Sequence, residues 1–304
     1  MTTSAVVRVR VPAKINLALC VGPRADDGFH PLGTVFEAVN LFDEVLLWPA
    51  DEVNLNIVGE GVDAVPTGPE NLAAKAFALL AARYTLPAPG VHLEIRKSIP
   101  VAGGMAGGSA DAAATLLAVN EWAGLGMDAE ELRSHAAELG SDVPFALLGG
   151  VALGTGRGDH VMPIMQRGHH HWVLAFSEGG LSTPAVYGRF DELVPDGRDV
   201  DVPDAMIDAL AAGDVERLAS TLRNDLQEAA LDLRPDLQKI LDAGQRAGAL
   251  AGIVSGSGPT CAFLCRNEDA AVRVSAALGA EPGIVGVRRV HGPVPGARII
   301  REHA

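Results

Sequence analysis

The alternation of apolar and polar residues predicts strands along much of the chain. It is strict over Val6–Val11, is interrupted by Pro12, and resumes over Lys14–Leu19. Another alternating run, Val91–Lys97, comes directly before the most glycine-rich stretch. Further strands are expected at Val35–Leu41, Asp43–Trp48, Val53–Ile57, within Gly149–Gly158, and at Trp172–Phe176, Ala251–Val254, Thr260–Cys265 and Ile284–Val290.

Apolar residues at helical spacing predict helices between these strands. Over Glu70–Tyr84 the apolar side chains gather on one face, and Asn71 stands near the start. Ala129–Leu139 is followed by Gly140, a residue typical of the position after a helix. Other helices are expected at Ser109–Ala123, from near Pro144, at the end of Leu181–Tyr187, and at Pro203–Ala212, Asp214–Leu231, Pro235–Ala247 and Asn267–Leu278. Strands mixed with pairs of helices favour an α+β sandwich.

A polar segment near residues 157–170 is the expected boundary between two domains, 1–165 and 166–304. It runs into three consecutive histidines, His169–His171. Neighbouring side chains point in different directions on any regular element, so a surface loop is favoured over a metal site.

Composition and charge narrow the function. The chain has 304 residues, of which 48% are hydrophobic and 20% charged, enough to build the cores of two domains. Its net charge of −14 disfavours a nucleic-acid surface but allows a small anionic substrate in a local pocket. No signal peptide and no apolar span of about 18 residues is found, which predicts a protein without a membrane partner.

The three cysteines, Cys20, Cys261 and Cys265, form no Cys-x-x-Cys pair. Cys261 and Cys265 lie in a strand-like run and should face the same side. They are interpreted as buried, reduced thiols of a cytoplasmic protein.

The glycine-rich stretch Pro100–Asp111 lies between a predicted strand and a predicted helix. Glycines allow backbone N–H groups to converge, and a helix N-terminus adds partial positive charge, so the stretch suits a phosphate group. The first amides of the helix are expected to be satisfied by Ser109 or Asp111. A flexible connector is the alternative. Neither the Walker A pattern nor the dinucleotide fingerprint fits.

Other polar residues have two interpretations each. Lys14 and Asn16 share a face of the first strand, where a solvated lysine is the plain alternative. Phe29 and His30 end a turn-rich loop and could stack on and hydrogen-bond a planar ring, or His30 could be an ordinary surface histidine. Asp142 could simply cap the helix that begins near Pro144.

The stretch Pro100–Asp111 resembles the second motif of the GHMP kinases, a family that includes galactokinase and the homoserine, mevalonate and phosphomevalonate kinases. Lys14 and the turn Ser255–Gly258 match the order of the family's other motifs. Four runs resemble the branch that acts on 4-diphosphocytidyl-2-C-methyl-D-erythritol: Pro12–Leu17, Arg24–His30, Gly140–Phe145 and Asn224–Leu226. The run Arg24–His30 is one residue longer than the pattern of that branch and has Phe29 in place of a tyrosine.

The resemblance implies an N-terminal ribosomal-S5-like domain, a C-terminal ferredoxin-like domain and an active site in the cleft between them. It implies transfer of a phosphoryl group from ATP, with Mg²⁺, to the 2-hydroxyl of that acceptor, in the non-mevalonate route to isoprenoids. A monomer or a homodimer is expected, and the sequence does not distinguish the two.

The resemblance also implies roles for residues. Lys14 and Asp142 would be the catalytic pair, and Ser109 would be the candidate metal contact. ATP would be bound by the loop residues Pro100, Val101, Ala102, Gly103, Gly104, Met105, Ala106, Gly107, Gly108, Ser109 and Ala110.

For the acceptor, Phe29 and Tyr187 would enclose the cytosine and His30 would bond its edge. The remaining acceptor contacts would come from Asn16, Thr183, Ser255 and Gly256. Alternatives are another small-molecule kinase of the family, or a non-catalytic nucleotide-binding protein of the same fold.

Overall fold

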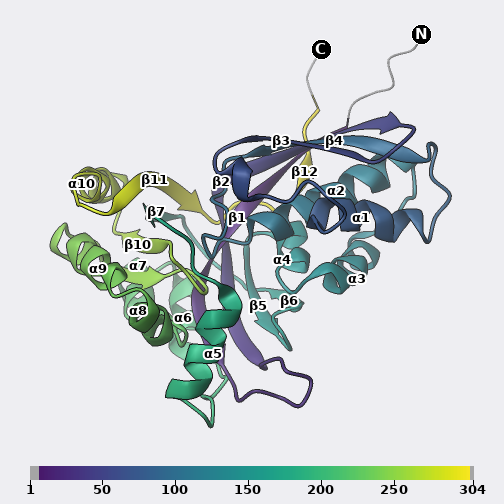
Figure 1. Cartoon of the computed structure of the whole chain (residues 1–304). Coiled ribbons are helices and arrows are strands. Elements are labelled where there is room, and N and C mark those ends of the chain that lie inside the picture. Colours follow the sequence, from purple (N-terminus) through teal and green to yellow (C-terminus); the bar gives the residue numbers. More distant parts are fainter. Residues whose placement is uncertain (1–6, 302–304) are drawn as a thin grey trace.

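The computed structural model describes residues 7–301 and contains two β-sheets with helices packed on both (Figure 1). The first sheet has the strand order β12-β1-β2-β4-β3, with β5 and β6 continuing beside β2 and β8 beside β1. Its strands are β1 (Val7–Val21), β2 (Leu32–Ala50), β3 (Asn54–Gly59), β4 (Gly90–Lys97), β5 (Val151–Thr155), β6 (His160–Pro163), β8 (Arg223–Asn224) and β12 (Arg298–Ile299). The expected mixed α+β architecture is therefore observed.

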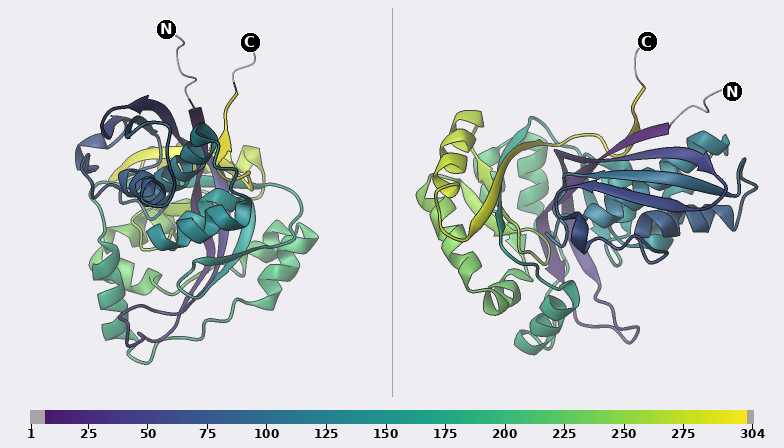
Figure 2. Two further views of the ribbon diagram at one scale, coloured as in Figure 1. Left: turned by 90° about the vertical axis from the view of Figure 1, so that its right-hand side faces the viewer. Right: turned by 45° about the horizontal axis from the view of Figure 1, so that its top comes forward.

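Helices of the first half form one layer beside this sheet (Figure 2). They are the 3₁₀ turn η1 (Val62–Ala64), α1 (Leu72–Ala81), α2 (Gly107–Ala123), α3 (Ala129–Leu139) and α4 (Val143–Leu148). The central helix α2 buries a run of alanines against β1, β2 and α1, and their small side chains allow close approach. As predicted, Asn71 begins α1, where its side chain accepts from the Ala73 amide, and Gly140 ends α3.

The second sheet is antiparallel, in the order β11-β7-β10-β9. Its strands are β7 (His170–Ser177), β9 (Ala251–Val254), β10 (Cys261–Cys265) and β11 (Ile284–Gly292). The helices of this half are α5 (Thr183–Leu193), α6 (Asp204–Ala212), α7 (Val215–Ala219), α8 (Gln227–Leu233), α9 (Asp236–Arg246) and α10 (Glu268–Leu278). One face of β7 packs in the second core through Val173 and Ala175, and the other joins the first core through Trp172 and Leu174.

Along the chain, β6 of the first sheet ends at Pro163, and the next strand, β7 of the second sheet, begins at His170. We therefore propose the division of the chain into 1–165 and 166–304, with β8 and β12 returning to the first sheet.

The hairpin of β1 and β2 is longer than predicted. Val6, the first residue of the predicted strand, lies outside the described residues. Pro12 does not interrupt β1, contrary to the prediction. The strands predicted at Val35–Leu41 and Asp43–Trp48 form the single strand β2. A register shift between Pro12 and Ala13 accommodates the proline within the pairing. The end of β1 enters the second core through Leu19 and Val21, so the hairpin connects both halves and carries its loop toward α5 (Figure 1).

The single helix predicted over residues 214–231 is wrong, because the chain there forms α7, β8 and α8. The Asn224 side chain donates to the carbonyls of Val254 and Gly256, at 2.8 and 2.7 Å. The Asp225 carboxylate accepts from the amide of Val21 at 2.9 Å. These bonds draw the backbone out of helical geometry and fix the turn after β9.

The surface loop predicted for the histidines is wrong for two of the three, since His170 and His171 lie in β7. His170 is buried and faces the buried carboxylate of Glu37 on β2, with its Nδ1 3.0 Å from each carboxylate oxygen. Burial lowers the pKa of His170, Glu37 raises it, and the net change is upward. The two sheets are thus joined by a buried ion pair.

Replacing His170 by Gln is expected to destabilise the protein more at pH 6 than at pH 9. A histidine whose pKa is raised by folding contributes stability that is full below its unfolded pKa of about 6.5 and is lost as the pH rises through the folded value. Denaturant unfolding of wild type and variant at both pH values measures this. His171→Gln, on the neighbouring position of β7, is the control, and an equal loss at both pH values would contradict the prediction.

The three cysteines are free and buried, as predicted, and Cys261 and Cys265 face the same core. Burial raises the pKa of Cys261 to about 12 and that of Cys265 to about 11, so both stay protonated thiols. Within residues 7–301, no helix combines the length and the apolar character needed to cross a bilayer.

Candidate active site

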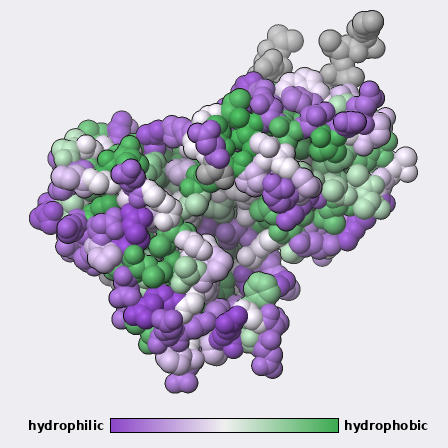
Figure 3. All heavy atoms as spheres, viewed as in Figure 1, coloured by the Kyte–Doolittle hydropathy of each residue, from purple (hydrophilic) through white to green (hydrophobic). Residues whose placement is uncertain are grey.

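A cavity of about 1050 Å³ opens between the two halves of the molecule, where the space-filling view is hollowed (Figure 3). Its walls come from β1, the loop before β2, the glycine loop before α2, the start of α4, α5 and the turn after β9. Segments far apart in the sequence therefore meet at one site.

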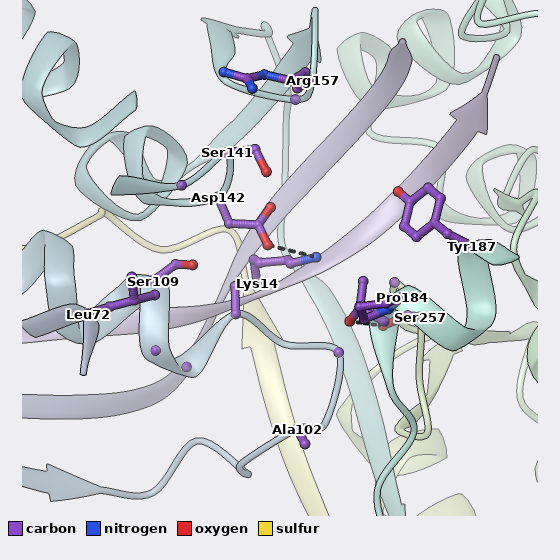
Figure 4. A pocket seen from close by; sticks show the side chains of 18 of the residues that line it. Lys14, Leu72, Ala102, Ser109, Ser141, Asp142, Arg157, Pro184, Tyr187 and Ser257 are labelled. Carbon is purple, nitrogen blue, oxygen red and sulfur yellow. Dashed lines mark hydrogen bonds and ion pairs between the residues drawn. The ribbon is translucent and has the colours of Figure 1, made fainter. Parts of the chain in front are cut away.

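Lys14 and Asp142 face each other in this cavity, with Lys14 Nζ 3.7 Å from the Asp142 carboxylate (Figure 4). Lys14 Nζ also donates to Asn16 Oδ1 at 2.7 Å, and Asn16 Nδ2 donates to Thr34 Oγ1 at 2.9 Å. Lys14 is buried, so the interpretation as a solvated strand lysine is wrong. Asn16 fixes the direction of the Lys14 ammonium, a positioning role that the sequence did not indicate.

Asp142 stands at the N-terminal end of α4, but its side chain makes no capping hydrogen bond. Pro144 occupies the first turn, where its missing N–H removes one donor. The alternative that Asp142 serves as a helix cap is therefore wrong, and its carboxylate, 31% exposed, is directed toward Lys14.

The glycine loop connects β4 to α2, as the pattern predicted, but α2 begins earlier than expected, at Gly107. Ala106 precedes it in the left-handed conformation, with φ 59°, and no side chain caps the helix. The predicted caps are therefore wrong: Ser109 lies inside the first turn and Asp111 points elsewhere. The first amides of α2 have no side-chain acceptor, which is the condition for binding an anion there.

Gly104 fixes the loop against the turn after β9. It has a φ of +72°, and a Cβ on it would lie 2.1 Å from the backbone oxygen of Ser255. Ser255 Oγ donates to the Gly104 carbonyl at 3.1 Å. Ser255 is buried and does not line the cavity, whereas Gly256 does. The turn after β9 thus holds the glycine loop in place.

Most of the residues predicted to bind ATP line the cavity, but two do not. Met105 and Ala110 are buried in the first core. The Met105 carbonyl accepts from the Lys14 amide at 3.4 Å, so this residue anchors the loop to β1.

A buried charge cluster lies behind the glycine loop. Lys97, the last residue of β4, donates to the carboxylates of Asp43 and, at 2.7 Å, Asp111. Burial lowers the pKa of Lys97, but the two carboxylates together raise it by more, so the net change is upward. Burial raises the pKa of Asp111 well above its usual range, Lys97 opposes this, and Asp43 adds to it. One ammonium cannot neutralise two carboxylates, and the pKa of Lys97 and that of Asp111 are both raised.

This cluster of Asp43, Lys97 and Asp111 was not predicted from the sequence. The only available signal was the position of Lys97 and Asp111 on either side of the glycine loop. Asp111 Oδ1 has no hydrogen-bond partner within residues 7–301.

Away from the glycine loop, another part of the cavity is lined by the aromatic side chains of Phe29, His30 and Tyr187. His30 and Tyr187 have ring centroids 5.0 Å apart, and the Nε2 atom of His30 lies 2.6 Å from an oxygen of Asp191. His30 is buried, so the interpretation as an ordinary surface histidine is wrong. Burial, and then the charge of Asp142, raise the pKa of Tyr187, which keeps its hydroxyl protonated. The Phe29 side chain is 53% exposed.

Thr183, at the start of α5, lines the same region. Its hydroxyl lies 2.8 Å from that of Ser257, in the turn after β9. Among the lining residues that the sequence did not indicate are Glu138, Arg157 and Asp191. Glu138 lies on α3, Asp191 on α5 and Arg157 in the turn between β5 and β6. No local motif marks these positions, and only the fold brings them to the cavity.

Known proteins resemble the chain over nearly its whole length. The family model described as GHMP kinases N terminal domain matches residues 71–150, and the one described as GHMP kinases C terminal matches residues 206–284. A 4-diphosphocytidyl-2-C-methyl-D-erythritol kinase from Nocardia farcinica is 53% identical over 296 residues, covering 97% of this chain and 96% of its own.

Two solved structures have a similar fold. A 4-(cytidine 5'-diphospho)-2C-methyl-D-erythritol kinase superposes with a TM-score of 0.77 at 32% identity, covering 93% of this chain and 98% of its own. A homoserine kinase from Cytophaga hutchinsonii superposes with a TM-score of 0.76 at 21% identity, covering 99% of both chains. The second likeness, at its low identity, concerns the fold alone.

Proposed function

The chain belongs to the GHMP kinase family, and from that premise we propose how its cavity carries out phosphoryl transfer. The activity is that of an ATP-dependent 4-diphosphocytidyl-2-C-methyl-D-erythritol kinase of isoprenoid biosynthesis. We assign the transfer to the 2-hydroxyl of the acceptor. The observation that supports the assignment most directly is the pairing of Lys14 with Asp142 beside an uncapped helix N-terminus.

ATP is held by its phosphates against the loop from Pro100 to Ala110. The uncapped amides at the start of α2 and the left-handed Ala106 present N–H groups, which can replace a P-loop lysine. Met105 and Ala110 support the loop from the core rather than contact the nucleotide.

Mg²⁺ fits this site as an ion carried by the nucleotide. No cluster of three or more His, Cys, Asp or Glu side chains suited to a metal occurs within residues 7–301. Mg²⁺ commonly binds through one or two protein groups, with phosphates and water completing its shell. Ser109, whose hydroxyl lines the cavity in the first turn of α2, is the proposed protein contact. Bound there, the ion offsets the negative charge of the phosphates.

Lys14 and Asp142 act on the acceptor hydroxyl. Asp142 accepts the proton of the acceptor hydroxyl, or holds that hydroxyl in line with the γ-phosphorus. The hydroxyl oxygen forms a bond to the γ-phosphoryl group as the bond to ADP breaks and ADP leaves. Lys14 offsets negative charge on the group in transfer. Asn16 holds the Lys14 ammonium in place through its 2.7 Å hydrogen bond.

The acceptor lies toward the aromatic end. Phe29 and Tyr187 enclose the cytosine, and His30 bonds its edge, with Asp191 fixing the direction of the imidazole. Thr183 and Asn16 contact the methylerythritol and diphosphate portion. Gly256 has a φ of +55°, and a Cβ there would lie 3.1 Å from the Gly104 carbonyl oxygen, so glycine suits this position of the turn beside Lys14.

The alternatives are a homoserine or mevalonate kinase activity and a non-catalytic nucleotide-binding protein. The test is phosphate transfer from ATP to the cytidyl acceptor, with homoserine and mevalonate measured alongside. Transfer to the cytidyl acceptor alone is the expected result. Transfer to either control substrate, or ATP binding without transfer, would overturn the proposal.

Replacing Phe29 by Ala is expected to raise the KM for the cytidyl acceptor by about tenfold, because one stacked base–aromatic contact is worth about 1–3 kcal/mol. The KM for ATP and kcat should change little, since the proposed stacking involves the base of the acceptor and not the group in transfer. Steady-state kinetics with each substrate varied in turn measures this. An unchanged acceptor KM with a lowered kcat would contradict the stacking role.

We further propose a cytoplasmic location, on the basis of the three free, buried thiols. A monomer or a homodimer is the proposed state in solution.

A further inference from the structure

The cavity is poor in unpaired positive charge. Its lining includes the cations Lys14, Arg24, Lys97 and Arg157. Lys97 is bonded to two buried carboxylates, and Lys14 to Asn16 with Asp142 nearby. Because the whole chain carries a net charge of −14, an anionic acceptor needs a cation close to where it lies. The two arginines are the remaining candidates.

Arg24 is partly committed to its own loop. Its Nε donates to the Gly28 carbonyl at 3.2 Å, and a second nitrogen lies 3.9 Å from Asp191. Arg157 is freer. Within residues 7–301 its guanidinium donates no hydrogen bond, and its one ion-pair partner is Asp159 at 3.9 Å. Arg157 therefore keeps its N–H donors available.

The turn between β5 and β6 places Arg157 at the aromatic end of the cavity. Gly156 and Gly158 have φ of +69° and +90°, which lets the chain reverse around Arg157. The Gly156 carbonyl accepts from the Leu32 amide at 2.8 Å, and the Arg157 amide donates to Asp159 at 3.0 Å. The turn is thus fastened to the end of the loop that carries Phe29 and His30.

The guanidinium carbon of Arg157 lies 4.8 Å from the centroid of the Phe29 ring. Figure 4 shows Arg157 on the side of Asp142 away from Ala102 of the glycine loop. A guanidinium that stacks through its face keeps its N–H groups in the plane, where they can form two parallel bonds to a phosphate. Stacking on Phe29 therefore aims these donors without using them.

We propose that Arg157 is a specificity-determining residue that binds the diphosphate of the acceptor and stays stacked on Phe29. The inference rests on the proposed function, because a cytosine held near Phe29 brings its own phosphates next to this guanidinium. It assigns the recognition of charge to Arg157 and the recognition of the base to Phe29, His30 and Tyr187. A nucleoside without phosphates would not use Arg157.

The test compares wild type with Arg157→Gln and Arg157→Lys, using CDP and cytidine as competitive inhibitors. In Arg157→Gln, the inhibition constant of CDP and the KM of the acceptor should rise on the order of tenfold or more, as expected for losing a hydrogen bond to a charged group. The inhibition constant of cytidine and kcat should be nearly unchanged. Arg157→Lys should lie between, because lysine keeps the charge but not the paired geometry.

Arg246→Gln, an exposed arginine on α9, is the matched control and should behave as wild type. If the constants of CDP and cytidine rise together, Arg157 only supports the Phe29 ring, and the inference is overturned. It is also overturned if neither constant changes. A wild-type enzyme that does not phosphorylate the cytidyl acceptor would instead defeat the proposed function, so the two failures are separable.

Discussion

Replacing Asp142 by Asn is expected to lower kcat by about 10²–10⁴-fold, the usual contribution of a positioned general base. Asn has nearly the same shape but accepts no proton and carries no charge opposite Lys14, whose ammonium lies 3.7 Å away. Because Asp142 caps nothing in α4, the fold should be preserved. In the proposed site ATP contacts the glycine loop rather than this residue, so its dissociation constant should stay within about twofold.

The measurement combines steady-state kinetics with calorimetric titration of ATP. Asp128→Asn is the matched control, because Asp128 caps α3 through its side chain and asparagine caps a helix equally well. The control should keep wild-type kcat. A folded Asp142→Asn enzyme with undiminished kcat would remove Asp142 from the catalytic role.

Replacing Lys97 by Met is expected to destabilise the protein by about 3–5 kcal/mol, the cost of breaking a buried ion pair from one side. Asp43 and Asp111 would then face each other without a compensating charge, beneath the start of α2. The Lys97 ammonium lies 3.2 Å from where a Cβ of Gly107 would stand, so the glycine loop should lose its position as well. Denaturant unfolding measures the loss, and ATP titration its effect on the loop.

Two variants keep this expectation testable. Lys75→Met changes an exposed lysine of α1 and should cost little. Asp111→Asn removes the carboxylate whose pKa burial raises, and its cost should be smaller than that of Lys97→Met. A raised carboxyl pKa weakens the fold as the pH rises above the unfolded value of about 3.9, so the variant should lose less stability than wild type between pH 4 and 7. Equal losses for Lys97→Met and Lys75→Met would contradict the role of the cluster.

Much of the fold was predictable because its patterns are local. The alternation in Val91–Lys97, the glycines after it and the alanine-rich helix follow one another as expected. The errors arose where distant partners decide the geometry. Pro12 is tolerated because a register shift against β2 accommodates it. Asn224 leaves the helical conformation because carbonyls of Val254 and Gly256 accept its side-chain hydrogens.

The site shows the same division. Lys14, Phe29, His30 and Asp142 could be named from motifs, but His30 depends on Asp191 and Phe29 on Arg157, and no local pattern marks either partner. The cluster of Asp43, Lys97 and Asp111 is equally silent in the sequence, because its members come from a strand, a second strand and a helix.

By itself the sequence determined most of the elements, the strand–glycine loop–helix unit and the chemical groups available for transfer, since these depend on neighbours along the chain. Only the tertiary structure decided that Lys14 is buried rather than solvated, that Asp142 turns from its helix toward that ammonium, and that Arg157 stands over Phe29. The physical reason is that burial, charge pairing and stacking act through space, and the packing of the two sheets sets which side chains come within reach.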